Sequence, residues 1–136
     1  MKKKSNYPWS DPIGETNHYH VYKDKYPVTE GHLLFVPVED HEVYLDKCFL
    51  GAYIQGRALV KEGVCDGFNI GMNMGEHAGQ TVMYPHIHLI PRREGDLGRF
   101  ENGTPYDPAG GVRNVIPEKG NYKKHEPDPE QMRLFE

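Results

Sequence analysis

Alternating apolar and polar positions predict four strands in the first two thirds of the chain. Segments 18–24 (HYHVYKD) and 31–38 (GHLLFVPV) are rich in aromatic and β-branched residues, and turn-prone residues separate them. We expect these two segments to form an antiparallel pair. Segments 67–75 and 81–91 are predicted as two further strands, joined by the small-residue loop EHAGQ.

One helix is predicted between the two pairs of strands. Apolar residues recur at roughly helical intervals over 44–63, and Gly63 is a plausible residue to end the helix. Gly51 and Gly56 lie inside this segment and weaken its helical propensity.

From Glu94 onward, Gly, Pro, Asn and charged residues dominate, which predicts a loop-rich C-terminal third. We expect one domain over 1–121, followed by a mobile tail over 122–136. A chain of 136 residues with 37% hydrophobic residues fits a single core.

Charge and composition exclude several classes of function. The net charge is −4 and the Lys and Arg residues are scattered, so we expect no binding of nucleic acid duplexes or membranes. A small anionic ligand stays possible, since it needs only local donors. Polar residues follow Lys2–Lys4 where a signal peptide would be apolar, so the expected location is the cytoplasm. Cys48 and Cys65 are interpreted as reduced, structural thiols.

The segment QTVMYPHIHLIPRR, residues 80–93, places two histidines two positions apart on a predicted strand. Side chains at alternate positions of a strand share a face. We therefore expect one face to carry Tyr84, His86 and His88, and the apolar face to carry Met83, Ile87 and Leu89.

Two imidazoles on one face allow three interpretations: a metal pair, a catalytic pair, or surface histidines without a task. A zinc site needs a third ligand. The candidates for that ligand are His32, His41, His77, Asp96 and the cysteines. The preceding loop GEHAGQTV favours phosphate chemistry instead, because its backbone N–H groups, the Gln80 amide and the Thr81 hydroxyl can donate to an anion.

At this point the sequence resembles the histidine triad (HIT) family. FNIGMNMGEHAGQTVMYPHIHLIPR is similar to the family's Asn-containing strand, A-G-Q-[ST]-V loop and H-φ-H-φ-H-φ-φ motif, where φ is apolar. DKYPVTEGHLLFVP, upstream, resembles its D-x-x-P-x-x-x-G-H-x-L-x-x-P segment. The resemblance covers about residues 20–93. GGVRNVIPEKGNY, residues 110–122, is similar to a stretch of bacterial dinucleoside polyphosphate hydrolase-like members.

The sequence departs from the family motif at one position. Tyr84 occupies the first triad position, whereas His86 and His88 occupy the second and third. The second histidine is the nucleophile in the family, so the resemblance implies that the reacting residue is retained. The replacement puts substrate choice and rate in doubt, more than the class of reaction.

The resemblance also implies roles for other residues. Asn73, with Gln80 and Thr81, is expected to face the phosphate, and Asp24 to accept the ribose hydroxyls. His32 matches the Gly-His position and is expected to support the histidine face.

The expected activity is that of a nucleotide hydrolase or nucleotidyl transferase. It would act on dinucleoside polyphosphates or nucleoside phosphoramidates through a covalent nucleotidyl-histidine. No cofactor is expected to be required, although a divalent cation could accompany a polyphosphate. The alternatives are a nucleotide-binding module with impaired catalysis and a zinc-binding structural protein.

We expect an α+β fold: an antiparallel sheet of about five strands with one main helix across a face. The family resemblance adds a two-fold homodimer in which the sheets are continuous.

Gln131–Phe135 (QMRLF) resembles the short peptide with which bacterial proteins dock into the sliding clamp of DNA replication. The alternative is that Leu134 and Phe135 fold back onto the domain or its partner.

Overall fold

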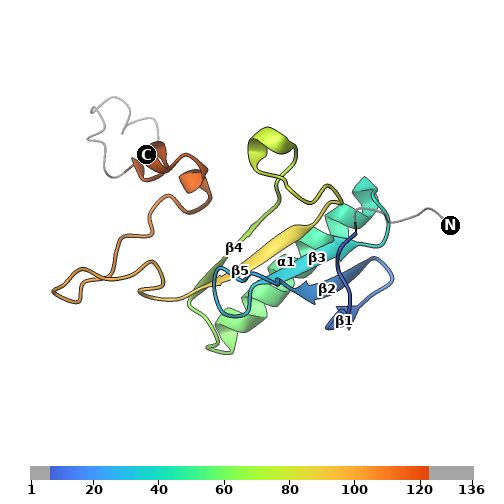
Figure 1. Cartoon of the computed structure of the whole chain (residues 1–136). Coiled ribbons are helices and arrows are strands. Elements are labelled where there is room, and N and C mark those ends of the chain that lie inside the picture. The colour runs from blue at the N-terminus through green and yellow to red at the C-terminus, as the bar shows by residue number, and fades with distance from the viewer. Residues whose placement is uncertain (1–6, 123–136) are drawn as a thin grey trace, which may run out of the picture. The chain divides into compact units, whose positions relative to one another are not determined.

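The computed structural model describes residues 7–122 and shows one antiparallel sheet with strand order β1-β2-β3-β5-β4 (Figure 1). The strands are β1 (Gly14–Glu15), β2 (Tyr19–Lys23), β3 (Leu33–Pro37), β4 (Gly67–Gly71) and β5 (Ile87–Arg92). The predicted α+β class, with about five strands and one main helix, is confirmed. Only β1 was absent from the sequence prediction, because two residues are too short to show alternation.

The main helix, α1 (Glu42–Lys61), crosses one face of the sheet (Figure 1). The His41 side chain caps its start by accepting a hydrogen bond from the Val43 N–H. Gly63 follows the C-cap residue with φ of 78°, a left-handed conformation that glycine adopts without steric cost. His41, a candidate zinc ligand in the sequence, therefore serves as a helix cap.

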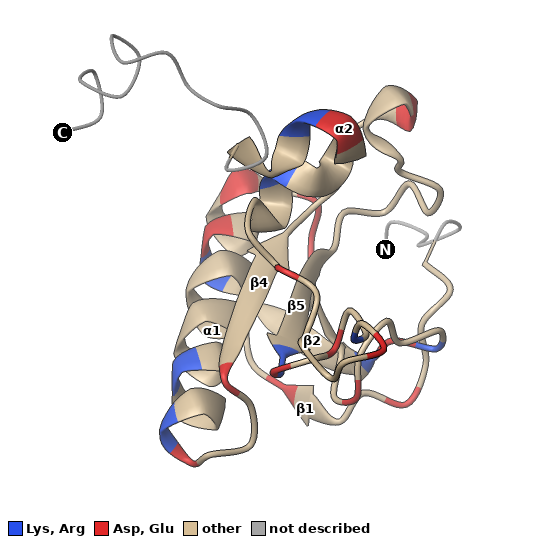
Figure 2. Cartoon of the chain, turned by 90° about the vertical axis from the view of Figure 1, so that its left-hand side faces the viewer, with Lys and Arg blue, Asp and Glu red and all other residues tan. Residues whose placement is uncertain are grey.

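The first and last turns of α1 carry charges of opposite sign (Figure 2). Glu42 lies in the first turn and Lys61 in the last turn. This distribution stabilises the helix, because acidic groups interact favourably with its N-terminal end and basic groups with its C-terminal end.

The main core lies between α1 and the sheet. Its buried members come from β3, α1 and β5: Phe35, Cys48, Ala52, Ile87 and Leu89. Both cysteines are free and buried, as expected for structural thiols.

A second cluster covers the opposite face of the sheet. Tyr22, Leu34 and Val36 are buried there, and Tyr7, Trp9 and Tyr84 pack against them. Because the faces of a strand alternate, this is also the face that His86 and His88 occupy.

The histidine segment differs from its prediction at its N-terminal end. Ile87 and Leu89 are fully buried in the main core, as predicted. Met83, however, is 51% exposed and does not lie on the core face, because β5 begins only at Ile87. Pro85 explains the shorter strand, since it has no N–H to continue the ladder.

The chain forms two compact units, Met1–Arg93 and Glu94–Glu136. The second unit contains a 3-10 helix η2 (Gly111–Val115) and a single turn α2 (Pro117–Gly120). The Arg113 side chain joins them by donating hydrogen bonds to the carbonyls of Gly120 and Lys119. Gln131–Phe135, the predicted clamp-binding peptide, lies outside the described residues.

Within residues 7–122, no helix is long and apolar enough to cross a membrane.

Candidate active site

His86 lies just before β5, and its ring orientation is set by the chain that precedes it. Its Nδ1 is 2.8 Å from the Tyr84 carbonyl oxygen. A carbonyl can only accept, so Nδ1 carries the proton of the neutral ring and Nε2 keeps its lone pair. His86 therefore presents a bare nitrogen, the form that a nucleophile requires.

His88 has the opposite arrangement. The Val28 N–H donates to His32 Nδ1 at 3.2 Å, so the proton of the neutral His32 ring must be on Nε2. His32 Nε2 lies 2.9 Å from His88 Nδ1 and donates to it. His88 is thereby held with its proton on Nε2, as a hydrogen-bond donor.

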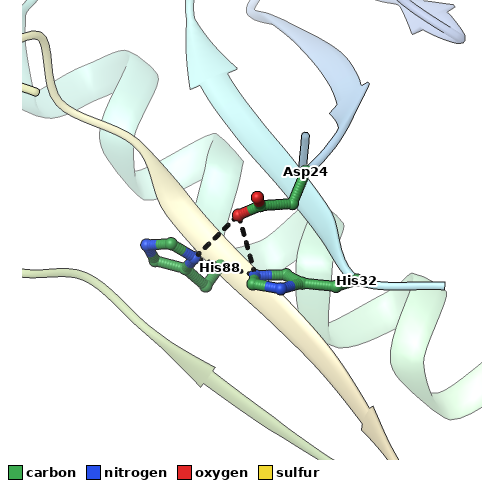
Figure 3. A group of neighbouring side chains, drawn as sticks. All are labelled: Asp24, His32 and His88. Carbon is green, nitrogen blue, oxygen red and sulfur yellow. Dashed lines mark hydrogen bonds and ion pairs between the residues drawn. The ribbon is translucent and has the colours of Figure 1, made fainter. Parts of the chain in front are cut away.

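Asp24, His32 and His88 come from three different elements and meet on the face of the sheet opposite α1 (Figure 3). Asp24 follows β2, His32 precedes β3, and His88 lies within β5. The Asp24 Oδ2 is 3.3 Å from His32 Nε2 and 3.9 Å from His88 Nδ1. Its Oδ1 accepts a hydrogen bond from the Tyr26 N–H, which orients the carboxylate.

Burial keeps the two supporting imidazoles neutral. Desolvation, with the nearby His86 and His32, lowers the pKa of His88 to about 4, although the Asp24 carboxylate opposes the shift. Desolvation also lowers the pKa of His32, again against Asp24. The contacts with Asp24 therefore join a carboxylate to neutral imidazoles and are not ion pairs at neutral pH.

The loop before the histidines is held together by Gln80, which is only 6% exposed. The Gln80 side-chain amide donates to the carbonyls of Val82 and Met83, and its oxygen accepts from the Gly75 N–H. The structure thus gives Gln80 a role in shaping the loop, and its predicted contact with phosphate stays a prediction.

Thr81 and Asn73 differ from Gln80 in being exposed, so a ligand can reach their polar groups. The Asn73 amide nitrogen lies beside Gly79, where an added Cβ would be 3.9 Å away. Gly75 and Gly79 both have φ of 93°, which lets this loop turn tightly before the histidine segment.

The hydroxyl of Tyr84, which occupies the expected first triad position, is bound within the protein. This hydroxyl donates to the Pro37 carbonyl at 2.7 Å, and burial raises its pKa to about 12. The Tyr84 ring packs edge-on against Tyr7, and Trp9 lies 5.0 Å from the His86 ring. Tyr84 is thus a neutral, packed residue at neutral pH.

The sequence did not predict that Trp9 and Val28 contribute to the site. Trp9 is far from His86 in the chain, and the Val28 contribution is a backbone N–H that no side-chain pattern reveals. The Pro-x-x-x-Gly-His segment was the only sequence signal that linked this turn to the site.

Among the described residues, Asp24, His32 and His88 form one cluster of potential metal ligands. Their ligand atoms all lie within 4.8 Å of one another. His88 thus groups with Asp24 and His32, whereas His86, its partner under the metal-pair interpretation, is not part of this group. His77 is exposed.

A model of the HIT domain matches residues 9–95. An uncharacterized HIT-like protein of Methanocaldococcus jannaschii is 38% identical over 91 residues, which cover 62% of this chain and 70% of that protein. The adenosine 5′-monophosphoramidase of Saccharomyces cerevisiae is 32% identical over 99 residues, covering 70% of this chain and 61% of the yeast protein. An adenylylsulfatase of Arabidopsis thaliana is 35% identical over 81 residues, covering 54% and 41%.

Solved structures of similar proteins share the fold. A zinc-bound histidine triad family protein from Mycobacterium smegmatis has a TM-score of 0.59 at 29% identity, covering 71% of this chain and 73% of that one. A HIT family protein from Bacillus anthracis has a TM-score of 0.55 at 32% identity, covering 62% and 65%.

Proposed function

Because the chain belongs to the HIT domain family, we propose that it is a nucleotide hydrolase or nucleotidyl transferase that acts at an α-phosphate. The proposed intermediate is a covalent nucleotidyl-His86. The observation that carries this proposal is the bare Nε2 of His86, whose ring is fixed by the Tyr84 carbonyl at Nδ1.

The first step forms a bond between His86 Nε2 and the α-phosphorus. The bond from phosphorus to the leaving group breaks, and the leaving group departs with the electron pair. His88 Nε2–H is suited to donate a hydrogen bond to the transferring phosphate or to the leaving group. Water then attacks the phosphorus and releases a proton to solvent, the P–N bond breaks, and its electron pair returns to His86 Nε2.

The proposed substrates are dinucleoside polyphosphates or nucleoside phosphoramidates. The second class is supported by the similarity to the yeast adenosine 5′-monophosphoramidase. The similarity to the plant adenylylsulfatase adds adenylyl sulfate to the substrates worth testing. All three classes share a nucleoside α-phosphate joined to a leaving group.

A substrate panel tests the proposal. Adenine and guanine dinucleotides, phosphoramidates and adenylyl sulfate are incubated with the protein, and nucleoside monophosphate release is followed. We expect at least one class to be turned over and the label of an α-³²P substrate to be trapped on His86 after acid-free quenching. No release from any class would instead favour the nucleotide-binding module with impaired catalysis.

Zinc binding is the second candidate function, and the Asp24–His32–His88 group favours it. The three distances between their ligand atoms are 2.9, 3.3 and 3.9 Å. Tetrahedral zinc with bonds of about 2.0–2.1 Å requires ligand atoms about 3.4 Å apart, so the group has a suitable size. Binding through His32 Nε2 requires the ring proton to move to Nδ1, which breaks the hydrogen bond from the Val28 N–H. The zinc-bound relative from Mycobacterium smegmatis supports the same candidate. Elemental analysis of protein purified without chelator, compared with His32→Ala, separates the two functions.

We also propose that the protein is a homodimer with a continuous sheet. β4 lies at the edge of the sheet, so one side of it has no paired strand among residues 7–122. α1 exposes Leu50, Tyr53 and Ile54, which are 46–57% accessible. An unpaired strand edge beside exposed apolar side chains is typical of a surface that another chain covers.

A further inference from the structure

The Tyr84 carbonyl orients His86, yet it lies outside the hydrogen-bond ladder of the sheet. β5 begins at Ile87, three residues later. The last pair between β3 and β5 is Phe35 with Ile87. A carbonyl in such a segment needs other contacts to hold its position.

Continuing this register would set Pro37 opposite Pro85. Pro85 has no N–H, so it can give the Pro37 carbonyl no hydrogen bond. The Tyr84 hydroxyl donates to that carbonyl instead, at 2.7 Å. The side chain of Tyr84 therefore ties the segment to the end of β3 at the place where the ladder stops.

Two further restraints act on the same peptide. A residue before proline is confined to extended conformations, which limits the backbone of Tyr84. Its ring packs 4.9 Å from Tyr7 and 6.3 Å from Trp9, measured between ring centroids. Both the side chain and the backbone of Tyr84 are thus restrained.

We propose that Tyr84 is the positioning residue for His86: its hydroxyl anchors the segment to Pro37, and its carbonyl thereby holds His86 with Nε2 bare. This inference rests on the proposed function only in its effect on turnover. It explains how a tyrosine serves at the first triad position. The tyrosine hydroxyl is occupied by Pro37, so Tyr84 acts on the reaction through His86.

The test compares Tyr84→Phe with the wild-type chain and with Tyr7→Phe. Tyr84→Phe keeps the ring and removes only the bond to the Pro37 carbonyl. Tyr7→Phe is a matched control, because the Tyr7 hydroxyl bonds the Tyr22 hydroxyl in the same aromatic cluster. Circular dichroism verifies that each variant is folded.

The first readout needs no substrate. Long-range ¹H–¹⁵N correlation spectra of ligand-free protein near neutral pH report which nitrogen of each histidine carries the proton. In the wild type and Tyr7→Phe we expect His86 with Nδ1 protonated and Nε2 bare. In Tyr84→Phe the two nitrogen shifts should move toward each other, as the two tautomers mix.

The second readout is turnover of whichever substrate the panel identifies. Misplacement of a reacting group lowers the rate steeply, so we expect kcat of Tyr84→Phe to fall about tenfold with KM changed by less than about twofold. Unchanged His86 shifts in Tyr84→Phe would overturn the proposal, whether or not the rate falls. A wild-type His86 with its proton on Nε2 would overturn it as well. Mixed tautomers with unchanged turnover would support the positioning role and count against His86 as the nucleophile.

Discussion

His86 and His88 lie on one face, and their tautomers differ because a different atom is hydrogen-bonded to Nδ1 of each ring. For His86 that atom is a carbonyl oxygen, whereas for His88 it is the protonated Nε2 of His32. At Nε2, His86 therefore has a lone pair, whereas His88 has an N–H. A nucleophile and a donor arise from identical side chains because their partners differ.

His86→Ala is expected to abolish turnover while nucleotide binding survives. The substitution removes the attacking nitrogen and leaves the rest of the face intact. Turnover assays and isothermal titration with a nucleoside monophosphate measure the two properties separately. Wild-type rates in this variant would show that His86 is not the nucleophile.

Tyr84→His introduces the histidine expected from the family resemblance but also removes the bond to the Pro37 carbonyl. Because position 84 carries no attacking atom, we expect the rate to change by no more than about the tenfold expected for Tyr84→Phe. The steady-state kinetics of both proteins on the same substrate provide the comparison. A gain of several orders of magnitude would show that the tyrosine impairs catalysis.

Asp24→Asn tests whether the carboxylate serves the ribose, as the family resemblance implies. For ribonucleotide substrates we expect KM to rise about ten- to a hundredfold, since a hydrogen bond to a charged group contributes about 1.5–3 kcal/mol. With 2′,3′-dideoxy substrates the variant should match the wild type. Glu30→Gln, a nearby exposed acid, is the control.

A rise in KM of Asp24→Asn that persists with dideoxy substrates would show that Asp24 does not act by binding the ribose hydroxyls. Asp24 would then act through His32, which lies 3.3 Å away.

At the scale of elements, packing against the sheet explains why α1 contains Gly51 and Gly56, although both lower its helical propensity. An added Cβ at Gly56 would lie 2.7 Å from the Phe68 ring of β4, and one at Gly51 would overlap the Tyr19 ring of β2. The helix can approach the sheet closely only because these positions lack side chains. Close packing therefore outweighs the intrinsic cost of glycine.

Gly56→Ala is expected to destabilise the fold despite the better helical propensity of alanine. Overpacking costs about 1–3 kcal/mol, whereas the propensity gain is about 1 kcal/mol. Urea unfolding followed by circular dichroism measures the difference in the free energy of unfolding. Gln55→Ala, on the exposed side of the same turn, should be neutral or slightly stabilising. Equal stability of Gly56→Ala and wild type would contradict the packing argument.

At the scale of the whole molecule, the lowered pKa of His88 links stability to pH. The folded protein holds this pKa at about 4, below the value of 6.5 for an unperturbed histidine. Between these values the unfolded chain binds more protons, so the contribution is complete above pH 6.5 and is lost as the pH falls toward about 4. At most it amounts to about 3 kcal/mol.

We expect the free energy of unfolding to decrease over this window in protein kept metal-free with EDTA. His88→Phe should show a smaller decrease, since it lacks the titrating ring. Urea titrations at a series of pH values give both curves. Parallel curves would show that His88 is not responsible.

The proposed dimer is tested by sedimentation velocity at micromolar concentration, where we expect twice the mass of the chain. Ile54→Lys, on the exposed apolar side of α1, should shift the distribution toward monomer. A monomeric wild type would contradict the continuous sheet.

The sequence by itself determined the α+β class, the main helix, four of the five strands and the face that His86 and His88 share. These features follow from local periodicity and from motifs of contiguous residues. It was wrong about Met83, because Pro85 ends the ladder before the alternating pattern ends.

Only the tertiary structure decided which groups contact one another in the candidate site. Asp24, His32 and His88 come from separate elements, and their meeting depends on the order of β2, β3 and β5 in the sheet. The tautomers of both histidines depend on backbone groups of Val28 and Tyr84, which every residue type supplies equally. A sequence pattern records side chains, so it cannot show which N–H or carbonyl the fold brings to each imidazole.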